Sequence, residues 1–518
     1  MGNDGTEIKH YIYIYIVYVG NYKQGADKSK LGLIMNFKSL FFICLMLACL
    51  ESIIAGPLKV LTPSEDDFYS LPDGYEDKEP GTILKIRKPP QQLRGIYFPI
   101  LVKGAWQALV RTTDSHGNAT AIVTTIIEPF NADPSKVVSY QVMQDSASIN
   151  CSPSYSFLYG ASMNTVFAQL EMYIIDVALM KGWYVVIPDY EGPKAAFTAG
   201  KQSGQSALDS IRAALKTTNI TGINEDAKVA MWGYSGGTVA TGWAAALQPT
   251  YAKELKSNLI GAAMGGFVTN ITSTAEGVEG TIFAGLTASA VAGLTNEYPQ
   301  LKSMVSKLLR PSKLAAYNKA QTLCFLPSIV TFAFQKFFTG PNRYIDEGWA
   351  LFKDPTIKKI IAENTLALKK GDPVPEIPLF VFHGELDKIV AYKDAVRTYN
   401  NWCEWGIDSY EFAIDETTGH VTEFIEGTPA AIAWLTKMFN GEKPVKGCKS
   451  TKRFTNLLYP GANTSVANML SDSVKTVLGE NFGPNAENID KGSGNASHVK
   501  RSLEELGVSL DFPPEGSM

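Results

Sequence analysis

Short apolar runs alternate with longer stretches of helical character over most of the chain. Their cores are rich in Val, Ile, Tyr and Phe, and most lack regular polar alternation, which is typical of strands covered on both faces. Because helical stretches lie between several of these runs, the pattern predicts an α/β fold with a mostly parallel sheet. The predicted strands lie at residues 120–129, 137–143, 184–190, 228–234, 378–384 and 409–415.

One segment, residues 270–362, departs from this pattern. It contains TIFAGLTASAVAGL and FLPSIVTFAFQKFF, two apolar helix-like stretches without flanking strand signals. We interpret the segment as an inserted helical lid or cap, although ordinary buried helices would leave the same pattern. An apolar insertion of this kind suits a cover over an apolar substrate channel.

The predicted lid divides the core into two parts, residues 57–269 and residues 363–450. The first part opens with a polar, Pro-containing stretch, residues 57–95, which we expect to wrap on the surface. The segment 451–518 becomes richer in Asn, Ser and Gly. We interpret it as a C-terminal flap or tail that is poorly ordered near its end.

The first 56 residues consist of two unlike pieces. Residues 35–56 carry a basic residue, an apolar run over 40–50 and small residues at the end, the pattern of a secretory signal peptide. The run is too short to span a bilayer, which takes about 20 apolar residues, and Glu51 ends it. We therefore expect a secreted, extracellular protein. Residues 1–34 contain the low-complexity run YIYIYIVYV, and we interpret them as a dubious extension upstream of a true start at Met35.

The composition is that of a globular protein with a large core. Of the 518 residues, 45% are hydrophobic and 19% are charged. The net charge is −4 and Lys and Arg are scattered, so we expect neither a nucleic-acid partner nor a polyanionic substrate. We infer no stable protein partner.

Four cysteines remain once the predicted signal peptide is removed. An even number in an oxidising compartment predicts two disulfides, for which the sequence allows three connectivities. The absence of CxxC spacing argues against structural zinc, and the Asn-X-Ser/Thr sequons fit a glycosylating secretory route. The cysteines are Cys151, Cys324, Cys403 and Cys448, and the sequons begin at Asn118, Asn150, Asn219, Asn270, Asn463 and Asn495.

The sharpest motif is GYSGG at residues 233–237. It lies between the predicted strand KVAMW and the small-residue stretch TVATGWAAAL. The pentapeptide alone arises by chance, but a strand, a sharp turn and a helix form a nucleophile elbow that lifts Ser235 above the sheet. The N–H of Gly236 then stands ready to donate to an oxyanion at the helix N-terminus.

A serine nucleophile needs a base, and the chain has only five histidines. His420 follows the predicted strand 409–415 through a short loop and precedes a helix-like stretch, in the chain order that hydrolases require. His383 ends the preceding strand, so we expect it to pack or hydrogen-bond locally and keep it as the second choice. The others lie in the dubious extension, in a polar turn and in the tail, at His10, His116 and His498.

The acid that orients the base lies in the loop after FVFHG. Asp387 is our choice because it stands three residues after the Gly and precedes an apolar residue and a helix. Glu385 is the second choice. Asp387 would also serve as the N-cap of a helix beginning near Tyr392, which is the structural alternative.

At these residues the chain resembles the fungal secretory lipase family, the lipase-A-like branch of the α/β-hydrolases. The resemblance runs from about residue 60 to 450, and the motifs are specific only as an ensemble. The matching pieces are GYSGG at 233–237, HGELDKIV at 383–390, TTGHV at 417–421, IPDYEGP at 187–193 and QVMQDSASINC at 141–151.

The resemblance implies a triacylglycerol lipase with an α/β-hydrolase core, a lid between the Ser and the Asp, and two defined disulfides. It also implies an oxyanion hole built from Asp145 and Gly236. The Asp145 side chain must be protonated to donate a hydrogen bond; its backbone N–H is the alternative, and the sequence leaves both open. The implied disulfides are Cys151–Cys324 and Cys403–Cys448.

We therefore expect Ser235, His420 and Asp387 to hydrolyse acylglycerol esters through an acyl-enzyme at an oil–water interface, without metal or organic cofactor. The apolar insertion favours long acyl chains. A secreted carboxylesterase, polysaccharide esterase or serine peptidase would use the same residues. A non-catalytic lipid-binding protein of the same fold is disfavoured because all three residues are present.

Overall fold

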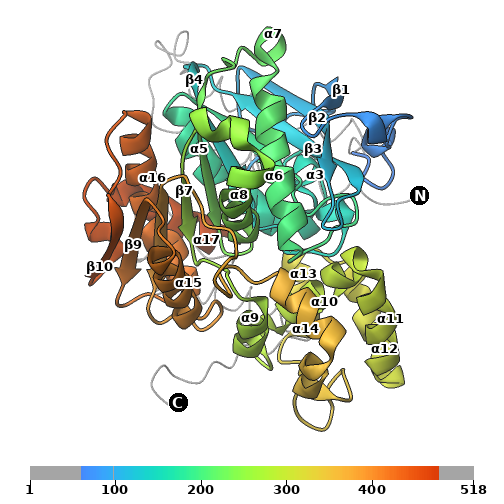
Figure 1. Ribbon diagram of the computed structural model, residues 1–518. Coiled ribbons are helices and arrows are strands. Elements are labelled where there is room, and N and C mark those ends of the chain that lie inside the picture. Colours follow the sequence, from blue (N-terminus) through green and yellow to red (C-terminus); the bar gives the residue numbers. More distant parts are fainter. Residues whose placement is uncertain (1–59, 97–98, 478–518) are drawn as a thin grey trace, which may run out of the picture. The chain divides into compact units, whose positions relative to one another are not determined.

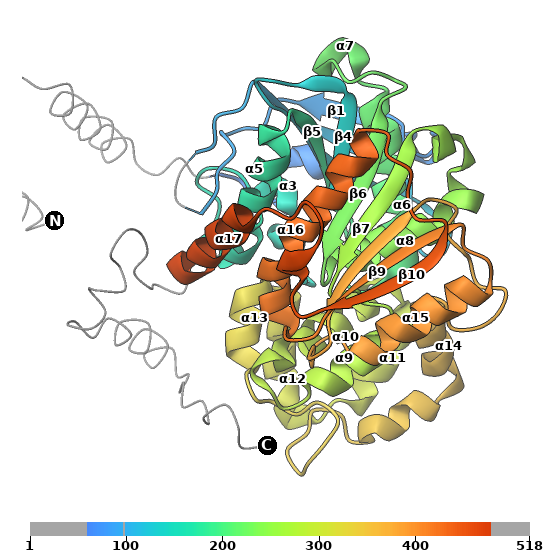
Figure 2. The ribbon, with the colours of Figure 1, turned by 90° about the vertical axis from the view of Figure 1, so that its left-hand side faces the viewer.

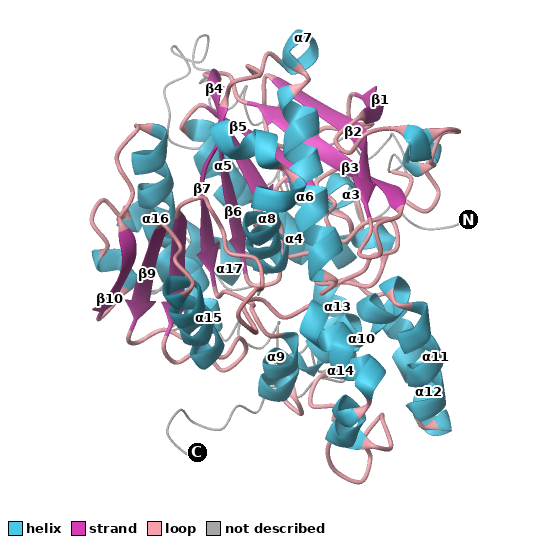
Figure 3. Ribbon diagram, in the orientation of Figure 1, coloured by secondary structure: helices cyan, strands magenta, loops and turns pink. Residues whose placement is uncertain are grey.

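A ten-stranded sheet forms the centre of the fold (Figures 1 and 3). The computed structural model describes residues 60–96 and 99–477. The predicted extension, the signal peptide and the end of the tail lie outside the described residues. The strands are β1 Ile83–Arg87, β2 Gly104–Thr113, β3 Ala119–Glu128, β4 Asp133–Gln141, β5 Trp183–Pro188, β6 Lys228–Tyr234, β7 Leu259–Gly265, β8 Leu379–Gly384, β9 Ser409–Asp415 and β10 Gly447–Arg453.

The sheet order is β1-β2-β3-β5-β4-β6-β7-β8-β9-β10. The ladders from β1 to β5 at one edge are antiparallel, and every ladder from β5 through β4 to β10 is parallel. The predicted mostly parallel α/β sheet is therefore confirmed. Parallel strands have their carboxyl ends on the same side of the sheet. The loops after β6, β8 and β9 therefore meet on that side.

The predicted strands correspond to β3, β4, β5, β6, β8 and β9, and four strands were missed. β7 reads LIGAAMG, and its small residues carry little β-branched signal. β10 reads GCKSTKR, a polar edge strand without an apolar face. The expectation of a merely surface-wrapped segment 57–95 is corrected by β1, which pairs with β2. The boundary placed at residue 450 cuts through β10.

Two layers of helices cover the sheet, as Figures 1 and 2 show from two sides. The alternation along β6 explains them: Val229 and Met231 point into one core, and Ala230 and Trp232 into the other. The helices of the first core are α6 Gly200–Leu215, α8 Gly237–Tyr251 and α15 Tyr392–Glu404. Those of the second are α3 Pro153–Ser156, α4 Val166–Leu170, α5 Met172–Met180, α16 His420–Phe439 and α17 Thr464–Val477; α7 Thr218–Thr221 follows α6.

A run of helices is inserted between β7 and β8. It corresponds to the segment predicted as a lid, residues 270–362. Figure 1 places these helices beyond the carboxyl ends of the parallel strands. They are α9 Ile271–Val278, α10 Gly285–Glu297, α11 Pro299–Leu308, α12 Pro311–Asn318, α13 Phe325–Phe332 and α14 Pro355–Glu363. In the described ranges, no helix is long and apolar enough to cross a membrane.

Two disulfides join segments that are distant in the sequence. Cys151, after β4, is bonded to Cys324, which caps α13 of the insertion. Cys403, near the end of α15, is bonded to Cys448 in β10. These are the two pairs that the resemblance implies, and the first ties the inserted helices to the core.

Replacing Cys151 and Cys324 together by Ser is expected to lower the free energy of unfolding by about 2–5 kcal/mol. The bond spans 173 residues, so its loss frees a long loop in the unfolded chain. Denaturant unfolding followed by circular dichroism measures the change. The matched control is the Cys403→Ser/Cys448→Ser pair, which opens a span of 45 residues; a larger loss there than in the first pair would contradict the expectation.

Candidate active site

Ser235 occupies a strained turn between β6 and α8. Its φ is 47°, in the left-handed region that non-glycine residues rarely adopt. The turn is held because Ser235 N–H donates to the Gly265 carbonyl at 2.9 Å. Glycine is required on both sides, since a side chain at Gly233 or Gly237 would collide with main-chain atoms packed against it. This is the predicted elbow geometry.

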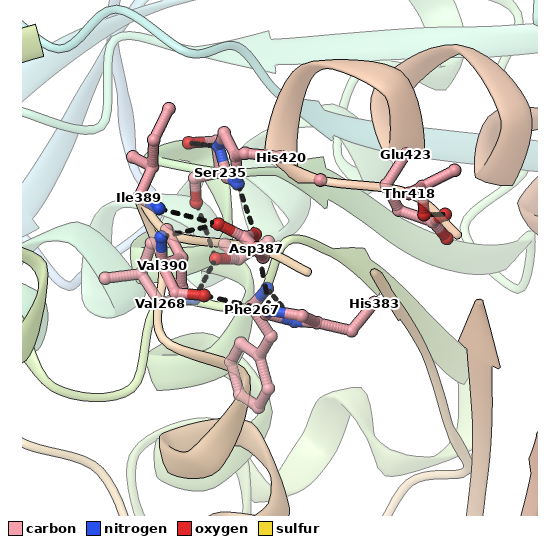
Figure 4. Close-up of polar contacts among 12 residues, drawn as sticks. Ser235, Phe267, Val268, His383, Asp387, Ile389, Val390, Thr418, His420 and Glu423 are labelled. Carbon is pink, nitrogen blue, oxygen red and sulfur yellow. Dashed lines mark hydrogen bonds and ion pairs between the residues drawn. The ribbon is translucent and has the colours of Figure 1, made fainter. Parts of the chain in front are cut away.

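Ser235, His420 and Asp387 form one chain of hydrogen bonds (Figure 4). Ser235 Oγ lies 2.7 Å from His420 Nε2, and His420 Nδ1 lies 2.6 Å from Asp387 Oδ2. His420 is the first residue of α16, directly after the short loop that follows β9. Its carbonyl accepts a hydrogen bond of 2.6 Å from the Tyr234 hydroxyl, which anchors the backbone of His420.

Asp387 is buried, and its carboxylate is surrounded by donors. The N–H groups of Ile389 and Val390 donate to Oδ1 at 2.9 and 2.8 Å. Burial alone would raise the pKa of Asp387, but the charge of His420 and hydrogen bonds from His383 and His420 hold the pKa well below its usual range. The carboxylate therefore stays ionised beside His420. Asp387 accepts from N–H groups of the turn that precedes α15, but it is not the N-cap of that helix. The N-cap residue is Ala391.

The second choices for acid and base lie elsewhere. Glu385 points toward the surface and pairs with Lys452 at 2.6 Å. His383 contacts Asp387 rather than Ser235. His116 Nε2 bonds the Glu297 carbonyl at 2.9 Å. His10 and His498 lie outside the described residues.

Asp145 faces Gly236 next to the Ser235 turn. A side chain at Gly236 would collide with Asp145 Oδ1, and Asp145 itself has a left-handed φ of 47°. Oδ1 is buried and has no hydrogen-bond partner among the described residues. Burial raises the pKa of Asp145 to about 7. The structure thus brings together both residues implied for the oxyanion hole.

Two further buried acids, which sequence reasoning missed, surround Asp145. Glu171 accepts hydrogen bonds from Met143 N–H at 2.8 Å and from the Tyr140 hydroxyl at 2.7 Å, and burial raises its pKa to about 8. Burial also raises the pKa of Glu191, whose carboxylate faces the N–H groups of Asp145 and Ser146. The available signal was a lone Glu in the apolar run FAQLEMYII, and a Glu just after the strand in IPDYEGP.

A narrow, largely apolar pocket, partly open to solvent, lies beside Ser235. Its walls come from α9 and α10 of the insertion, from the start of α8 and from the loops after β5, β7 and β8. The apolar side chains among the lining residues are Phe197, Val239, Val268, Ile271, Ala275, Val278, Leu286, Ala290, Ile389 and Val390.

The predicted glycosylation sites differ in exposure. Asn219 and Asn463 are exposed. Asn118 is also exposed, but its side chain bonds Asp114 at 3.1 Å. Asn270 caps α9, and its Nδ2 lies 3.2 Å from Asp394 Oδ1. The remaining sequons begin at Asn150, whose Oδ1 accepts from Ser64 N–H, and at Asn495, which lies outside the described residues.

Comparison with known proteins shows the family. The family model described as "Secretory lipase" matches residues 158–447, more than half of the chain. The chain belongs to the secretory lipase family. Within it, Lipase 1 of Candida albicans is 53% identical over 444 residues, which cover 85% of this chain and 94% of that protein. Lipase A of Arthroderma benhamiae is 38% identical over 429 residues, covering 82% and 90%.

A solved lipase has the same fold. Candida antarctica lipase A in its closed state matches this secretory lipase with a TM-score of 0.71 and 29% identity, covering 80% of this chain and 96% of that chain. The predicted α/β-hydrolase fold and the predicted class are therefore confirmed: this protein is a lipase, a carboxylic ester hydrolase.

Gly236→Ala is expected to lower kcat by about 100-fold. The added methyl group would displace the Asp145 side chain from its place next to the Ser235 turn. Ester hydrolysis at saturating substrate measures the loss. Gly95→Ala is the matched control, because a methyl group there makes an ordinary contact with the Tyr173 ring. Wild-type kcat in the Gly236 variant would show that this contact is unimportant.

Proposed function

We propose that this lipase is a secreted triacylglycerol lipase in which Ser235 is the nucleophile, His420 the base and Asp387 the acid that orients the base. The observation that carries the proposal is the continuous hydrogen-bond chain of 2.7 and 2.6 Å that starts at the pocket and ends on a buried, ionised carboxylate. Without such a base, a serine hydroxyl is a weak nucleophile.

The proposed reaction has two halves. His420 Nε2 takes the proton of Ser235 Oγ as the oxygen attacks the ester carbonyl, and it then gives that proton to the departing alcohol. Water attacks the acyl-enzyme in the same way and releases the fatty acid. Asp387 keeps the proton of His420 on Nδ1 and stabilises the imidazolium in each half.

The oxyanion of each tetrahedral intermediate is stabilised by the Gly236 N–H and by the Asp145 side chain. The N–H groups at the start of a helix have no partner within the helix, so that of Gly236 is available. The Asp145 side chain lies against Gly236, and its Oδ1 has no hydrogen-bond partner among the described residues, which favours the side chain as the second donor. A carboxyl donates only while it is protonated, and burial favours that state here.

The proposed substrate follows from the pocket. Its apolar walls suit an acyl chain, and the inserted helices that supply α9 and α10 act as the proposed lid, residues 270–362. Because apolar side chains line the pocket from two lid helices as well as from the core, we propose a preference for long acyl chains. Secretion is supported by the family description and by the two disulfides, which persist in oxidising compartments.

Ser235→Ala is expected to reduce the hydrolysis of emulsified triolein by several orders of magnitude, because it removes the nucleophile. The assay compares the secreted wild type and variant on triolein and on p-nitrophenyl butyrate and palmitate. Ser306→Ala is the control, because the hydroxyl of that exposed serine donates a hydrogen bond to the Lys302 carbonyl within α11. Activity of Ser235→Ala at the wild-type level would overturn the triad. Activity of the wild type on soluble esters alone would indicate a carboxylesterase.

Asp145→Asn is expected to abolish the alkaline fall of kcat/KM. In the wild type, Asp145 is protonated and donates below pH 7, and it becomes an anion that repels the oxyanion as pH rises through about 7. The Asn amide donates a hydrogen bond at every pH. We expect the pH-independent kcat/KM of the variant to be on the order of tenfold lower than that of the wild type. The pH dependence of kcat/KM between pH 5 and 9 measures this.

The other titratable groups that face Asp145 remain in the variant. They are Glu171, Glu191 and Tyr190, and burial raises the pKa of each. Asp176→Asn in α5 is the matched control, because it removes another carboxyl whose pKa is raised by burial. An unchanged alkaline limb in Asp145→Asn would assign that limb to another group.

A further inference from the structure

The proposed triad leaves His383 without a role, although it is completely buried at the end of β8. Figure 4 shows its ring directed toward Asp387, on the side away from His420. A polar ring of this kind is costly to bury unless both nitrogens have partners. The partners of the two nitrogens therefore define what His383 does.

The proton of the His383 ring is on Nε2. The backbone N–H of Phe267 donates to Nδ1 at 3.1 Å. A main-chain N–H can only donate, so Nδ1 carries a lone pair and the neutral ring has its proton on the other nitrogen. His383 is thus a donor at Nε2.

Two acceptors face that donor. Nε2 lies 3.0 Å from the Val390 carbonyl and 3.3 Å from Asp387 Oδ2. Oδ2 is the same oxygen that accepts from His420 Nδ1. The carboxylate thus receives three hydrogen bonds, two from main-chain N–H groups on Oδ1 and one from His420 on Oδ2, and His383 Nε2 adds a fourth, longer contact.

The same ring also connects the acid loop to the nucleophile turn. Phe267 lies in the loop after β7, and the next N–H in that loop, of Val268, donates to Thr238 Oγ1 at 2.9 Å. The Thr238 hydroxyl donates in turn to the Ser235 carbonyl at 2.5 Å. Hydrogen bonds therefore link Asp387 to Val390, Val390 to His383 and His383 to the loop after β7, and the next residue of that loop is linked through Thr238 to the backbone of Ser235.

We propose that His383 is a positioning residue for ester hydrolysis. Its Nε2–H holds the Val390 carbonyl of the acid loop and lies 3.3 Å from Asp387 Oδ2, which keeps the carboxylate aimed at His420, while its Nδ1 fixes the loop after β7. The inference rests on the proposed triad. It requires the donor on Nε2, whereas a residue that only fills space next to Tyr392, whose ring centre lies 6.0 Å away, requires only the volume of the ring.

The experiment separates the two nitrogens by substitution. In His383→Asn the amide oxygen can take the place of Nδ1 and accept from Phe267, but the side chain is too short to donate to Asp387. In His383→Gln the amide nitrogen can take the place of Nε2 and donate. His116→Asn is the matched control, since that exposed histidine bonds only a carbonyl of the insertion through its Nε2.

We expect His383→Asn to lower kcat by about 10- to 100-fold, the usual effect of losing a group that orients a ligand or acid. The loss of kcat in His383→Gln is expected to be several-fold smaller than in His383→Asn. In His383→Asn the acidic limb of kcat/KM should also move to higher pH, because an Asp387 carboxylate with one donor fewer attracts the proton of His420 more strongly. The titratable groups facing Asp387 are His420, His383 and Tyr234.

Both variants and the control are assayed on p-nitrophenyl palmitate from pH 5 to 9, and rates are normalised to the folded fraction by circular dichroism. Ser235→Ala is run beside them. If Ser235→Ala is inactive but His383→Asn keeps the wild-type kcat and acidic limb, or if Asn and Gln lose equally with unmoved limbs, the positioning role is wrong. If Ser235→Ala remains active, the triad itself is wrong.

Discussion

The strained turn at Ser235 is the constraint on which the rest of the site depends. A left-handed φ at a non-glycine residue costs on the order of 1–3 kcal/mol, and this turn is held by the hydrogen bond that Ser235 N–H donates to the Gly265 carbonyl of β7 and by the close packing of the neighbouring glycines. Because the turn is so tight, the hydroxyl projects from the end of β6 while the Gly236 N–H lies at the start of α8. One backbone conformation therefore positions both the proposed nucleophile and the proposed oxyanion donor.

The parallel sheet supplies the remaining groups. Asp387 and His420 follow β8 and β9, which pair with each other, and β7 separates them from β6. Carboxyl ends of parallel strands meet at one edge, so residues 185 positions apart come within hydrogen-bond distance. The loop after β7 lies between the Ser235 turn and the loop that carries Asp387. Its Val268 N–H donates to Thr238 beside the Ser235 turn, and its Phe267 N–H donates to His383.

The electrostatics of the site rest on how many donors each buried carboxyl receives. Asp387 receives three hydrogen bonds, lies 3.3 Å from His383 Nε2 and remains an anion despite its burial. Asp145 has an oxygen without a partner and faces two further acids, so the neutral form is favoured. Burial and donor number thus shift the pKa values of two aspartates in opposite directions, as the proposed roles of Asp387 and Asp145 require.

The sequence by itself determined the features that are local: the apolar runs that became six strands, the apolar insertion, and the elbow motif around Ser235. It missed β7 and β10 because small residues and a polar edge carry no periodic signal, and it named Asp387 over Glu385 from loop position alone. Only the tertiary structure decided that Glu191 faces the backbone of Asp145 and that His383 donates toward Asp387. Such contacts depend on the approach of segments far apart in the chain, and low dielectric and donor geometry act only once those segments are packed together.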